Sequence, residues 1–358
     1  MNKGFDVGQL DQSTAAQQVA LFNQVFNMNM SESCWLYMHR DNPLSTQYNI
    51  FGAVIGEELI GVNGFMSMNF HIGNQMFTAV QSGSSAVNPN YRGQGVFTKI
   101  ITSAEVFYRD LQVDFMLGFP NKNSYPAFMK MGWLHLLDMQ WITLPCNIIP
   151  MLEMILKISF PKMINKLTGI FWRKNYSIAK QCNNIEICVS DTSPFSEYEY
   201  EQINQSEKLA FSKSPVVVKW KLDYNPSSDF RYYVARKDNR LLSFFIVEER
   251  VMSQQNGMLW FRIIDWGLMS DNMSDIACSY AKMLLKMRNT ADLISLWMPM
   301  ERRYQDMFKR LGFIKNKKYF PVNPVIIKVL TTDAKKVNLL KNKNNWEPKL
   351  IEIDTLLI

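Results

Sequence analysis

The sequence has few of the residues that bind metal ions or form disulfides. Its three histidines, His39, His71 and His135, stand apart, and none has the short spacing of a metal-ligand pair. We therefore predict no metal site and expect these histidines at the surface or with satisfied hydrogen bonds. The cysteines number five, an odd count, and no two form a CxxC pair. This pattern favours buried or inert thiols in a reducing compartment over disulfides, and with it a cytoplasmic location.

Long uncharged apolar runs are also missing. The most apolar segment, Met151 to Lys174, carries recurring lysines and an internal proline, so it is too charged to cross a membrane. It is either a basic amphipathic segment on a membrane surface or an interdomain linker, and we favour a linker at residues 151–180. The first residues, 1–18, are polar and do not resemble a signal peptide.

The charge balance gives no indication of a nucleic-acid partner. The net charge is +7, from 39 basic and 32 acidic residues, and the basic residues are scattered instead of interleaved with aromatic ones. The mildly basic surface suits an anionic ligand, although most of it is an ordinary solvated face. With 358 residues and a hydrophobic fraction of 47%, the chain is predicted to form two globular domains, and no feature indicates its oligomeric state.

One stretch predicts a strand, a tight turn and a helix in succession. Phe77 to Val87 is rich in small, β-branched and aromatic residues, as a strand is, and Val96 to Tyr108 has apolar residues at helical spacing. Between them, Gly93 and Gly95 let the backbone come close to a ligand, and the helix start leaves N–H groups unpaired. Those donors and the helix dipole predict a phosphate or pyrophosphate site, with an ordinary glycine-containing turn as the alternative.

The turn resembles the acyl-CoA-binding loop of the GNAT N-acetyltransferases, which reads Q/R-x-x-G-x-G/A. Arg92, Gly95 and Phe97 occupy its three defined positions, and Phe97 departs from the expected Gly or Ala. A second GNAT signature, an Asn before a short helix that ends in Tyr-x-x-x-Gly-Phe, is similar to the segment about one strand downstream. There Asn121 occupies the Asn position and Phe128 the Tyr position, and Gly132 and Trp133 end the run.

The resemblance implies transfer of an acetyl group from acetyl-CoA to an amine, without a metal. In this family two strands splay apart, so a backbone N–H near Ala86 or Val87 would polarise the thioester carbonyl. Asn121 would face the pantetheine or the adjoining strand. The pyrophosphate would lie against Arg92 and the amides of Gly93, Gln94, Gly95, Val96, Phe97 and Thr98.

Two catalytic positions of the family are altered. The strand Phe77 to Val87 has no carboxylate where many relatives carry a Glu base. The usual Tyr acid is Phe128, but Tyr125, three residues earlier, shares a helical face with it and is the predicted catalytic acid, with packing as the alternative. The general base is unassigned. Asp354 or Glu352 of the tail would supply the missing carboxylate if the tail folds back, or the amine binds already deprotonated.

The second half of the chain repeats the order of elements of the first. Trp220 to Pro226 resembles Trp35 to Pro43, at an offset of roughly 180 residues that recurs in the following elements. Between Trp266 and Met273 the copy has no Arg-Gly-x-Gly, and Asp271 would place a negative charge where a pyrophosphate lies. We therefore predict that the second repeat does not bind CoA.

The predicted fold is α+β, with two GNAT-like domains in tandem, each a mixed, mostly antiparallel sheet flanked by helices, and with a degenerate second copy. Residues 1–150 would form the GNAT acetyl-CoA-binding catalytic domain, residues 151–180 an amphipathic linker and residues 181–330 the degenerate domain. Residues 331–358 form a C-terminal tail whose apolar end predicts docking at a place that the sequence does not indicate.

The predicted function is an N-acetyltransferase that acetylates a primary amine of a small molecule, such as an amino sugar, held between the halves. Two alternatives stay open. An aminoacyl-tRNA-dependent transferase of the peptidoglycan-bridge type also pairs GNAT-like domains, but its members generally lack a good CoA loop. A non-catalytic acyl-CoA-binding protein would explain the altered Glu and Tyr positions and would bind CoA without turnover. The acceptor and the acyl-chain length are not predicted.

Overall fold

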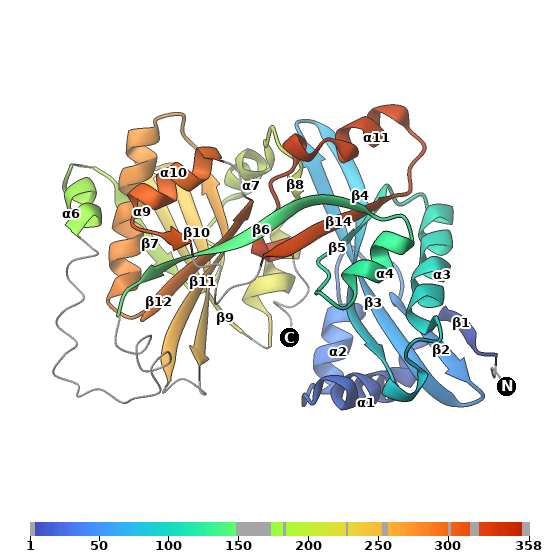
Figure 1. Cartoon of the computed structure of the whole chain (residues 1–358). Helices are drawn as coiled ribbons and strands as arrows, with labels where there is room; N and C mark the ends of the chain where they lie inside the picture. Colours follow the sequence, from blue (N-terminus) through green and yellow to red (C-terminus); the bar gives the residue numbers. More distant parts are fainter. Residues whose placement is uncertain are drawn as a thin grey trace.

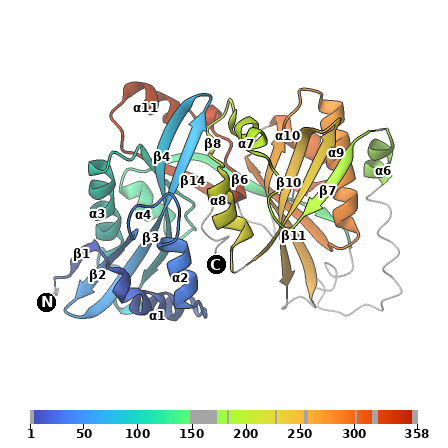
Figure 2. The ribbon, with the colours of Figure 1, turned by 180° about the vertical axis from the view of Figure 1, so that it is seen from behind.

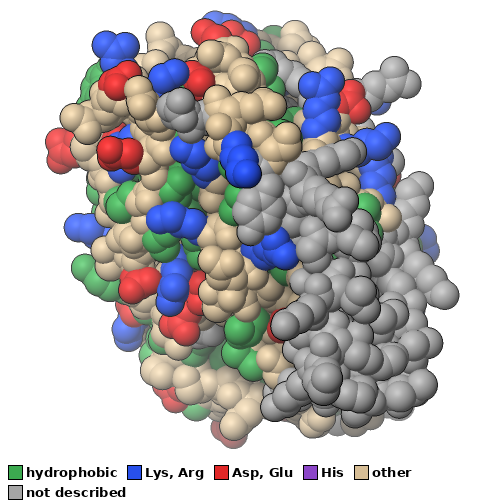
Figure 3. Space-filling view, turned by 90° about the vertical axis from the view of Figure 1, so that its left-hand side faces the viewer, with side chains coloured by type: hydrophobic (Ala, Val, Ile, Leu, Met, Phe, Trp, Pro, Cys, Tyr) green, Lys and Arg blue, Asp and Glu red, His purple; other side chains and the backbone are tan. Residues whose placement is uncertain are grey.

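The computed structural model describes residues 4–147, 173–181, 184–226, 228–252, 257–299, 302–315 and 322–352. The predicted linker at 151–180 lies outside these ranges except for helix α6 (Arg173–Lys180). Within the described ranges, no helix is long and apolar enough to span a membrane. On the face shown in Figure 3, the described Lys and Arg side chains are interspersed with Asp and Glu.

The described strands join into one 14-stranded sheet that runs through the whole molecule (Figure 1). The main path is β1-β2-β3-β4-β5-β14-β6-β12-β11-β10-β9-β7, with β8 added on β3 and β13 on β6. Among the named strands, β4–β5 and β11–β12 pair in parallel and the other neighbours are antiparallel. The first-half strands are β1 (Asp6–Gln9), β2 (Ile50–Ile55), β3 (Glu58–Ile72), β4 (Gln75–Val87), β5 (Phe115–Gly118) and β6 (Leu134–Pro145). The others are β7 (Glu186–Ser190), β8 (Ala210–Phe211), β9 (Asp229–Lys237), β10 (Arg240–Met252), β11 (Met258–Leu268), β12 (Leu293–Pro299), β13 (Ile314–Lys315) and β14 (Asn323–Val329).

Helices cover both faces of the first half of the sheet (Figures 1 and 2). They are α1 (Ala15–Phe26), α2 (Glu32–His39), α3 (Val96–Asp110) and α4 (Tyr125–Lys130). Neighbouring residues of β3 point to opposite faces, so Phe65 packs in the cluster with α3 and α4 while Met66 packs in the cluster with α1 and α2. Gly61 lets α3 approach β3 closely, because a Cβ there would come within 2.7 Å of the Val96 side chain. The mixed sheet with helices on its faces confirms the predicted α+β fold.

The second half repeats this order of elements. Its helices are α7 (Glu197–Asn204), α8 (Pro215–Val218), α9 (Met273–Arg288) and α10 (Arg302–Arg310), and α11 (Ala334–Lys341) follows in the tail. The succession β9-β10-β11-α9-β12-α10 matches β2-β3-β4-α3-β5-α4. The register of β4 shifts just past its last pair with β5, and that of β11 shifts just past its last pair with β12. The two halves therefore share a local irregularity as well as an order of elements.

The halves also exchange strands. β14, which follows the second half in the chain, lies between β5 and β6 of the first half. β6 pairs with β14 from Leu134 to Met139 and with β12 from Met139 to Pro145, so one strand belongs to both halves (Figure 1). The predicted boundaries at 1–150 and 181–330 stay predictions, and a cut between them would leave neither half with a complete sheet.

The tail docks on the first half. Trp346 is only 1% exposed, its ring lies 5.4 Å from the Phe115 ring and 6.0 Å from the Phe70 ring, and its Nε1 donates to the Leu340 carbonyl at 2.8 Å. Further on, Lys349 donates to the carbonyl of Trp266 on β11 at 2.6 Å. The described part of the tail thus contacts both halves. The sequence predicted that the tail docks but did not indicate where.

We expect Trp346→Ala to lower the free energy of unfolding by about 3 to 5 kcal/mol, because truncating a fully buried aromatic side chain leaves a cavity. Chemical denaturation measures the change. Tyr198→Ala is the matched control, since Tyr198 is 67% exposed and its loss should change stability by about 0.5 kcal/mol or less. Equal stability of the two variants would show that the tail does not support the fold.

The expectation that all cysteines are free thiols is wrong. Cys278 is disulfide-bonded. Cys146 and Cys188 are free thiols, and burial raises the pKa of the Cys146 thiol. The argument from unpaired thiols to a reducing compartment therefore no longer holds, and the cytoplasmic location stays a prediction.

Candidate active site

β4 and β5 run side by side and then separate. Their parallel pairing extends from Ala79–Phe115 to Ser82–Gly118, where β5 ends. β4 continues to Val87, and among the described strands only β3 pairs with this last part. The edge of β4 beyond Ser82 therefore faces a gap at the C-terminal ends of two parallel strands, a common position for ligand sites in sheets of this kind.

Val87 presents its backbone to this gap. The next residue, Asn88, donates its N–H to the Ile60 carbonyl of β3 at 2.9 Å. Because successive backbone groups of a strand point to opposite edges, the N–H and C=O of Val87 point away from β3. The Val87 carbonyl accepts from Arg92 Nε at 3.3 Å, in agreement with this direction. Ala86 is paired with Val62 of β3, so of the two predicted oxyanion donors Val87 has the suitable direction.

A polar cluster occupies the β4 bulge beside the gap. Ser84 has a left-handed backbone with φ of 48°, and Ser84 and Ser85 together oppose Asn63 of β3. The Asn63 side-chain oxygen accepts from Ser82 Oγ at 3.3 Å and also from Ser85 Oγ. The serines that the sequence placed on this strand therefore hold the bulge in shape on the α3 face of the sheet.

The predicted phosphate loop has open space around its two glycines. Gly93 and Gly95 have φ of 76° and 81°, and a Cβ on either would have no neighbour within 4 Å. Arg92, Gln94 and Thr98 are exposed beside them, and Val96 is buried as the first residue of α3. The loop therefore combines a left-handed backbone, which favours glycine, with open space around both glycines.

The N-terminus of α3 has no side-chain cap. Gly95 is its N-cap residue and supplies no side-chain hydrogen bond to the first turn. Uncapped helix N–H groups and the positive end of the helix dipole attract phosphate groups. The residues predicted to hold a pyrophosphate thus surround an accessible set of donors, and their role stays a prediction.

The two aromatic departures from the GNAT pattern contact each other. The Phe97 and Phe128 rings meet edge to face with centroids 5.3 Å apart, and Phe128 also packs against Trp133 at 4.6 Å. Phe128 is buried in the cluster beneath α3. Phe97 therefore lies against α4 with its ring partly covered, while Phe128 is a core residue with no hydroxyl to donate.

Asn121 shapes the loop before α4. Its side-chain oxygen accepts from the N–H groups of Asn123 at 2.9 Å and Ser124 at 3.1 Å, and its carbonyl accepts from the Tyr125 N–H at 3.0 Å. These bonds set the start of α4. The predicted contact of Asn121 with pantetheine is a separate role and stays a prediction.

Tyr125 begins a chain of polar contacts that the sequence did not indicate. Its hydroxyl lies 3.1 Å from His135 Nδ1, and His135 Nε2 lies 3.5 Å from Asp138 Oδ1. His135 and Asp138 belong to β6, which follows α4 directly, and both are accessible to solvent. In the sequence, only the i, i+3 spacing of His135 and Asp138 could have pointed to this contact. In a strand, residues three apart point to opposite faces, so the contact depends on the local shape of the backbone.

The expectation for the other two histidines is wrong. His39 and His71 are buried, and neither ring nitrogen of either one has a hydrogen-bond partner among the described residues. Burial lowers the pKa of His39 to about 3. Burial, together with Lys213 and Lys349, lowers the pKa of His71 to about 4. Both imidazoles are therefore neutral near pH 7.

Glu352 of the tail lies among buried charged side chains. Glu352 is buried in a charged group, where Lys213 and Lys349 lie 3.2 and 3.3 Å from the two oxygens of Asp265 on β11. Burial raises the pKa of Glu352 to about 8. Asp354, the other residue considered, lies outside the described residues. The role of Glu352 as the missing base stays a prediction.

The helix of the second half that corresponds to α3 has a capped N-terminus and an acidic first turn. α9 is capped by Asn272, whose side-chain oxygen accepts from Ser274 N at 3.0 Å and Asp275 N at 3.4 Å. Asp275 also adds a carboxylate to the first turn and pairs with Lys237 at 3.0 Å. The cap and the negative charge together oppose phosphate binding.

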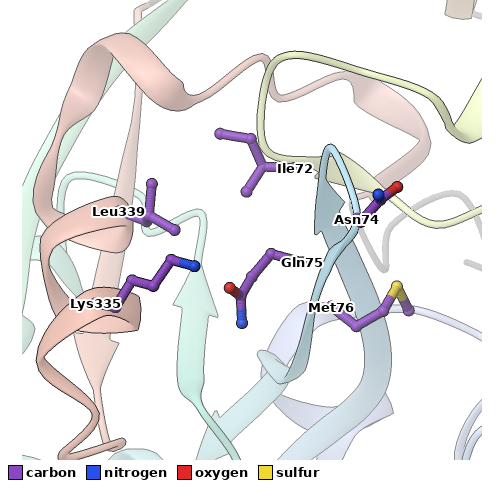
Figure 4. Close-up of a pocket in the computed structure, with 6 residues that line it drawn as sticks. All are labelled: Ile72, Asn74, Gln75, Met76, Lys335 and Leu339. Atoms are coloured by element: carbon purple, nitrogen blue, oxygen red, sulfur yellow. The ribbon is translucent and has the colours of Figure 1, made fainter.

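The cavity shown in Figure 4 lies away from the gap. A cavity of about 520 Å³ opens between the β3–β4 turn and α11, with Lys335 and Gln75 pointing into it (Figure 4). Gln75 begins β4, whereas the gap lies where β4 ends. The described part of the chain contains no cluster of three or more His, Cys, Asp or Glu residues that could hold a metal ion.

Comparison with known proteins identifies the first half. Residues 6–136 match the family model described as an acetyltransferase (GNAT) domain. Comparison by sequence with curated proteins gives no match.

Solved structures agree over most of the chain. A GCN5-related N-acetyltransferase from Anabaena variabilis is similar with a TM-score of 0.63 and 11% identity, covering 92% of this chain and 73% of that one. A probable N-acyltransferase from Enterococcus faecalis gives 0.64 and 12%, covering 91% and 72%. Eis1 from Mycobacterium abscessus gives 0.55 and 10%, covering 92% and 74%. At these identities the likeness shows the fold.

The family match includes the strands, loop and helix that surround the gap. Residues 6–136 therefore match a GNAT acetyltransferase domain.

Proposed function

We propose that the protein transfers an acetyl group from acetyl-CoA to a primary amine of a small molecule, such as an amino sugar. The observation that carries this proposal is the gap between β4 and β5 next to an open glycine loop on an uncapped helix. The loop suits the pyrophosphate and the gap suits the pantetheine arm. The acceptor class follows from the resemblance to two-domain GNAT enzymes.

The loop would hold the co-substrate by its backbone. The amides of residues 93–98 and the α3 dipole favour the negative charge of a pyrophosphate, and the exposed Arg92 adds a positive charge. The Val87 N–H, directed into the gap, would donate to the thioester oxygen as negative charge develops there. A donor in this position stabilises the transition state more than the ground state, which is the requirement for catalysis.

Tyr125 would protonate the thiolate of CoA as it leaves. The hydroxyl of Tyr125 contacts His135, and His135 contacts Asp138, which is accessible to solvent. His135 would return a proton to Tyr125 after each turnover, and Asp138 would hold the imidazole in place. Phe128 at the neighbouring turn of α4 has no proton to give, which favours Tyr125 for this role.

Calorimetric titration of acetyl-CoA into the wild-type protein tests the proposal. We expect saturable binding at one site per chain, together with acetylation of at least one amine in a panel that includes amino sugars. A ligand at a hundredfold its dissociation constant should also stabilise the fold by about 2.7 kcal/mol, which a thermal shift detects. Binding without turnover over the whole panel would favour a non-catalytic acyl-CoA-binding protein, and absence of binding would favour the tRNA-dependent alternative.

The stoichiometry should not change when Asp271 is replaced. Asp271→Ala removes the negative charge before α9, but the Asn272 cap and Asp275 remain at the helix start. We therefore expect one acetyl-CoA per chain in this variant, measured by the same titration. Binding of a second acetyl-CoA would mean that the charge of Asp271 alone prevents the second copy from binding it.

A further inference from the structure

His39 is a buried side chain without an evident structural partner. It ends α2, is 4% exposed, and neither of its ring nitrogens is hydrogen-bonded to a described residue. Leaving a buried polar group unpaired costs about 1 to 3 kcal/mol, so such a group calls for an explanation. Its ring packs against Trp35 with centroids 4.6 Å apart, which accounts for its position but not for its polar atoms.

The imidazole lies on β3, one strand away from the point where the β4–β5 gap begins. Its Cε1 would be 2.4 Å from a Cβ on Gly64, so the ring rests directly on the backbone of β3 where only glycine leaves room. Gly64 pairs with Gly83, the first residue of β4 beyond the last pair with β5. Because neighbouring strands are about 5 Å apart, His39 lies roughly one strand from the edge of the gap.

The two faces of the gap differ in chemistry. On the α3 face are the phosphate loop and the Asn63 cluster, so the co-substrate would enter from there. His39 lies on the opposite face, since Gly64 falls on the same side of β3 as Val62 and Met66, which pack with α1 and α2. A nucleophile that attacks the thioester from the side away from CoA would meet this imidazole.

We propose that His39 is the proton acceptor for the amine substrate of the proposed acetyl transfer. The amine lone pair attacks the thioester carbon, the carbon–sulfur bond breaks, and the sulfur takes its proton from Tyr125. The nitrogen, positively charged once its bond to carbon has formed, gives its N–H proton to a ring nitrogen of His39. This role rests on the proposed function and supplies the base that β4 lacks.

The protonation state of His39 suits this role. Burial lowers its pKa to about 3, and no charged group contributes to that shift, so the free enzyme holds a neutral imidazole with a lone pair available. The negative charge that would develop on the carbonyl oxygen in the gap would favour the protonated ring during the reaction. The imidazolium is disfavoured again after the product leaves, so the proton is released.

The test compares wild-type enzyme with His39→Gln in thiol release from acetyl-CoA over the amine panel. We expect kcat to fall by about 100-fold or more, with the dissociation constant of acetyl-CoA unchanged. His71→Gln is the matched control, because His71 is also buried with unpaired ring nitrogens but pairs with Met76 near the far end of β3. It should keep the wild-type kcat.

The outcomes separate this inference from the proposed function. Unchanged kcat in His39→Gln would overturn the assignment of His39 and leave the transferase intact, whereas failure of the wild type to bind acetyl-CoA would overturn the transferase itself. If the variant does not fold, or the wild type binds acetyl-CoA but acetylates no amine of the panel, imidazole nitrogen NMR on the wild type decides. Acetyl-CoA should shift the His39 signals and not those of His71, and unmoved His39 signals would refute the proposal.

Discussion

Gly95→Asp is expected to weaken acetyl-CoA binding by at least about 100-fold, beyond detection in a calorimetric titration. The substitution places a carboxylate at the N-terminus of α3, beside the expected pyrophosphate. Two like charges about 4 Å apart repel by about 1 to 4 kcal/mol for dielectric constants between water and a protein surface. The aspartate side chain would also cap the helix N–H groups that the ligand needs.

The control for this variant is Gly73→Asp. Gly73 also has a positive φ, 53°, and open space around it, but it lies in the β3–β4 turn away from the gap. Both variants carry the same added charge and comparable backbone strain, so a difference in affinity reports on the loop. Retained affinity in Gly95→Asp would remove the phosphate-site assignment, and equal loss in both variants would indicate a general effect of charge or stability.

Tyr125→Phe is expected to lower kcat by about 100-fold while leaving the dissociation constant of acetyl-CoA nearly unchanged. The change deletes only the hydroxyl, which lies 3.1 Å from His135, and keeps the ring that packs at the start of α4. A proton donor acts on the departing thiolate and not on the bound thioester, so the loss should fall on kcat. Steady-state kinetics with the best amine of the panel, combined with calorimetry, measure the two quantities.

A double-mutant cycle distinguishes proton transfer from packing. His135→Gln should lower kcat in the wild-type background and have little further effect in Tyr125→Phe, because both residues serve one step. Tyr198→Phe, on an exposed side chain, should behave as wild type. Additive losses for Tyr125 and His135, or an unchanged kcat in Tyr125→Phe, would reduce Tyr125 to a packing residue.

Local patterns in the sequence predicted the secondary structure around the candidate site. The helix expected from Val96 is α3, and the two glycines before it have the positive φ angles that a tight turn needs. These features depend on residues within one turn or one strand, whose preferences are set by sterics and hydrogen bonds close along the chain. The repeat was also visible, since the order of elements survives even where individual residues differ.

Such local patterns do not predict contacts between segments that lie far apart in the chain. His39 faces Gly64 and Tyr125 faces His135 only because strands and helices pack in one particular way. The insertion of β14 beside β5 joins residues about two hundred positions apart, and nothing in a strand pattern specifies its partner. The histidines lie far apart in the sequence, which led to the prediction of exposed or hydrogen-bonded side chains. Burial in the folded chain instead keeps His39 and His71 neutral.

By itself, the sequence determined the family resemblance, the α+β fold, the glycine loop at the start of α3 and the loss of that loop in the second copy, because each follows from residues near one another in the chain. The tertiary structure alone decided which backbone N–H faces the gap, where the tail docks, how the halves exchange β6 and β14, and which histidines are neutral and buried. These depend on pairing and burial, which arise only when distant segments displace water from one another.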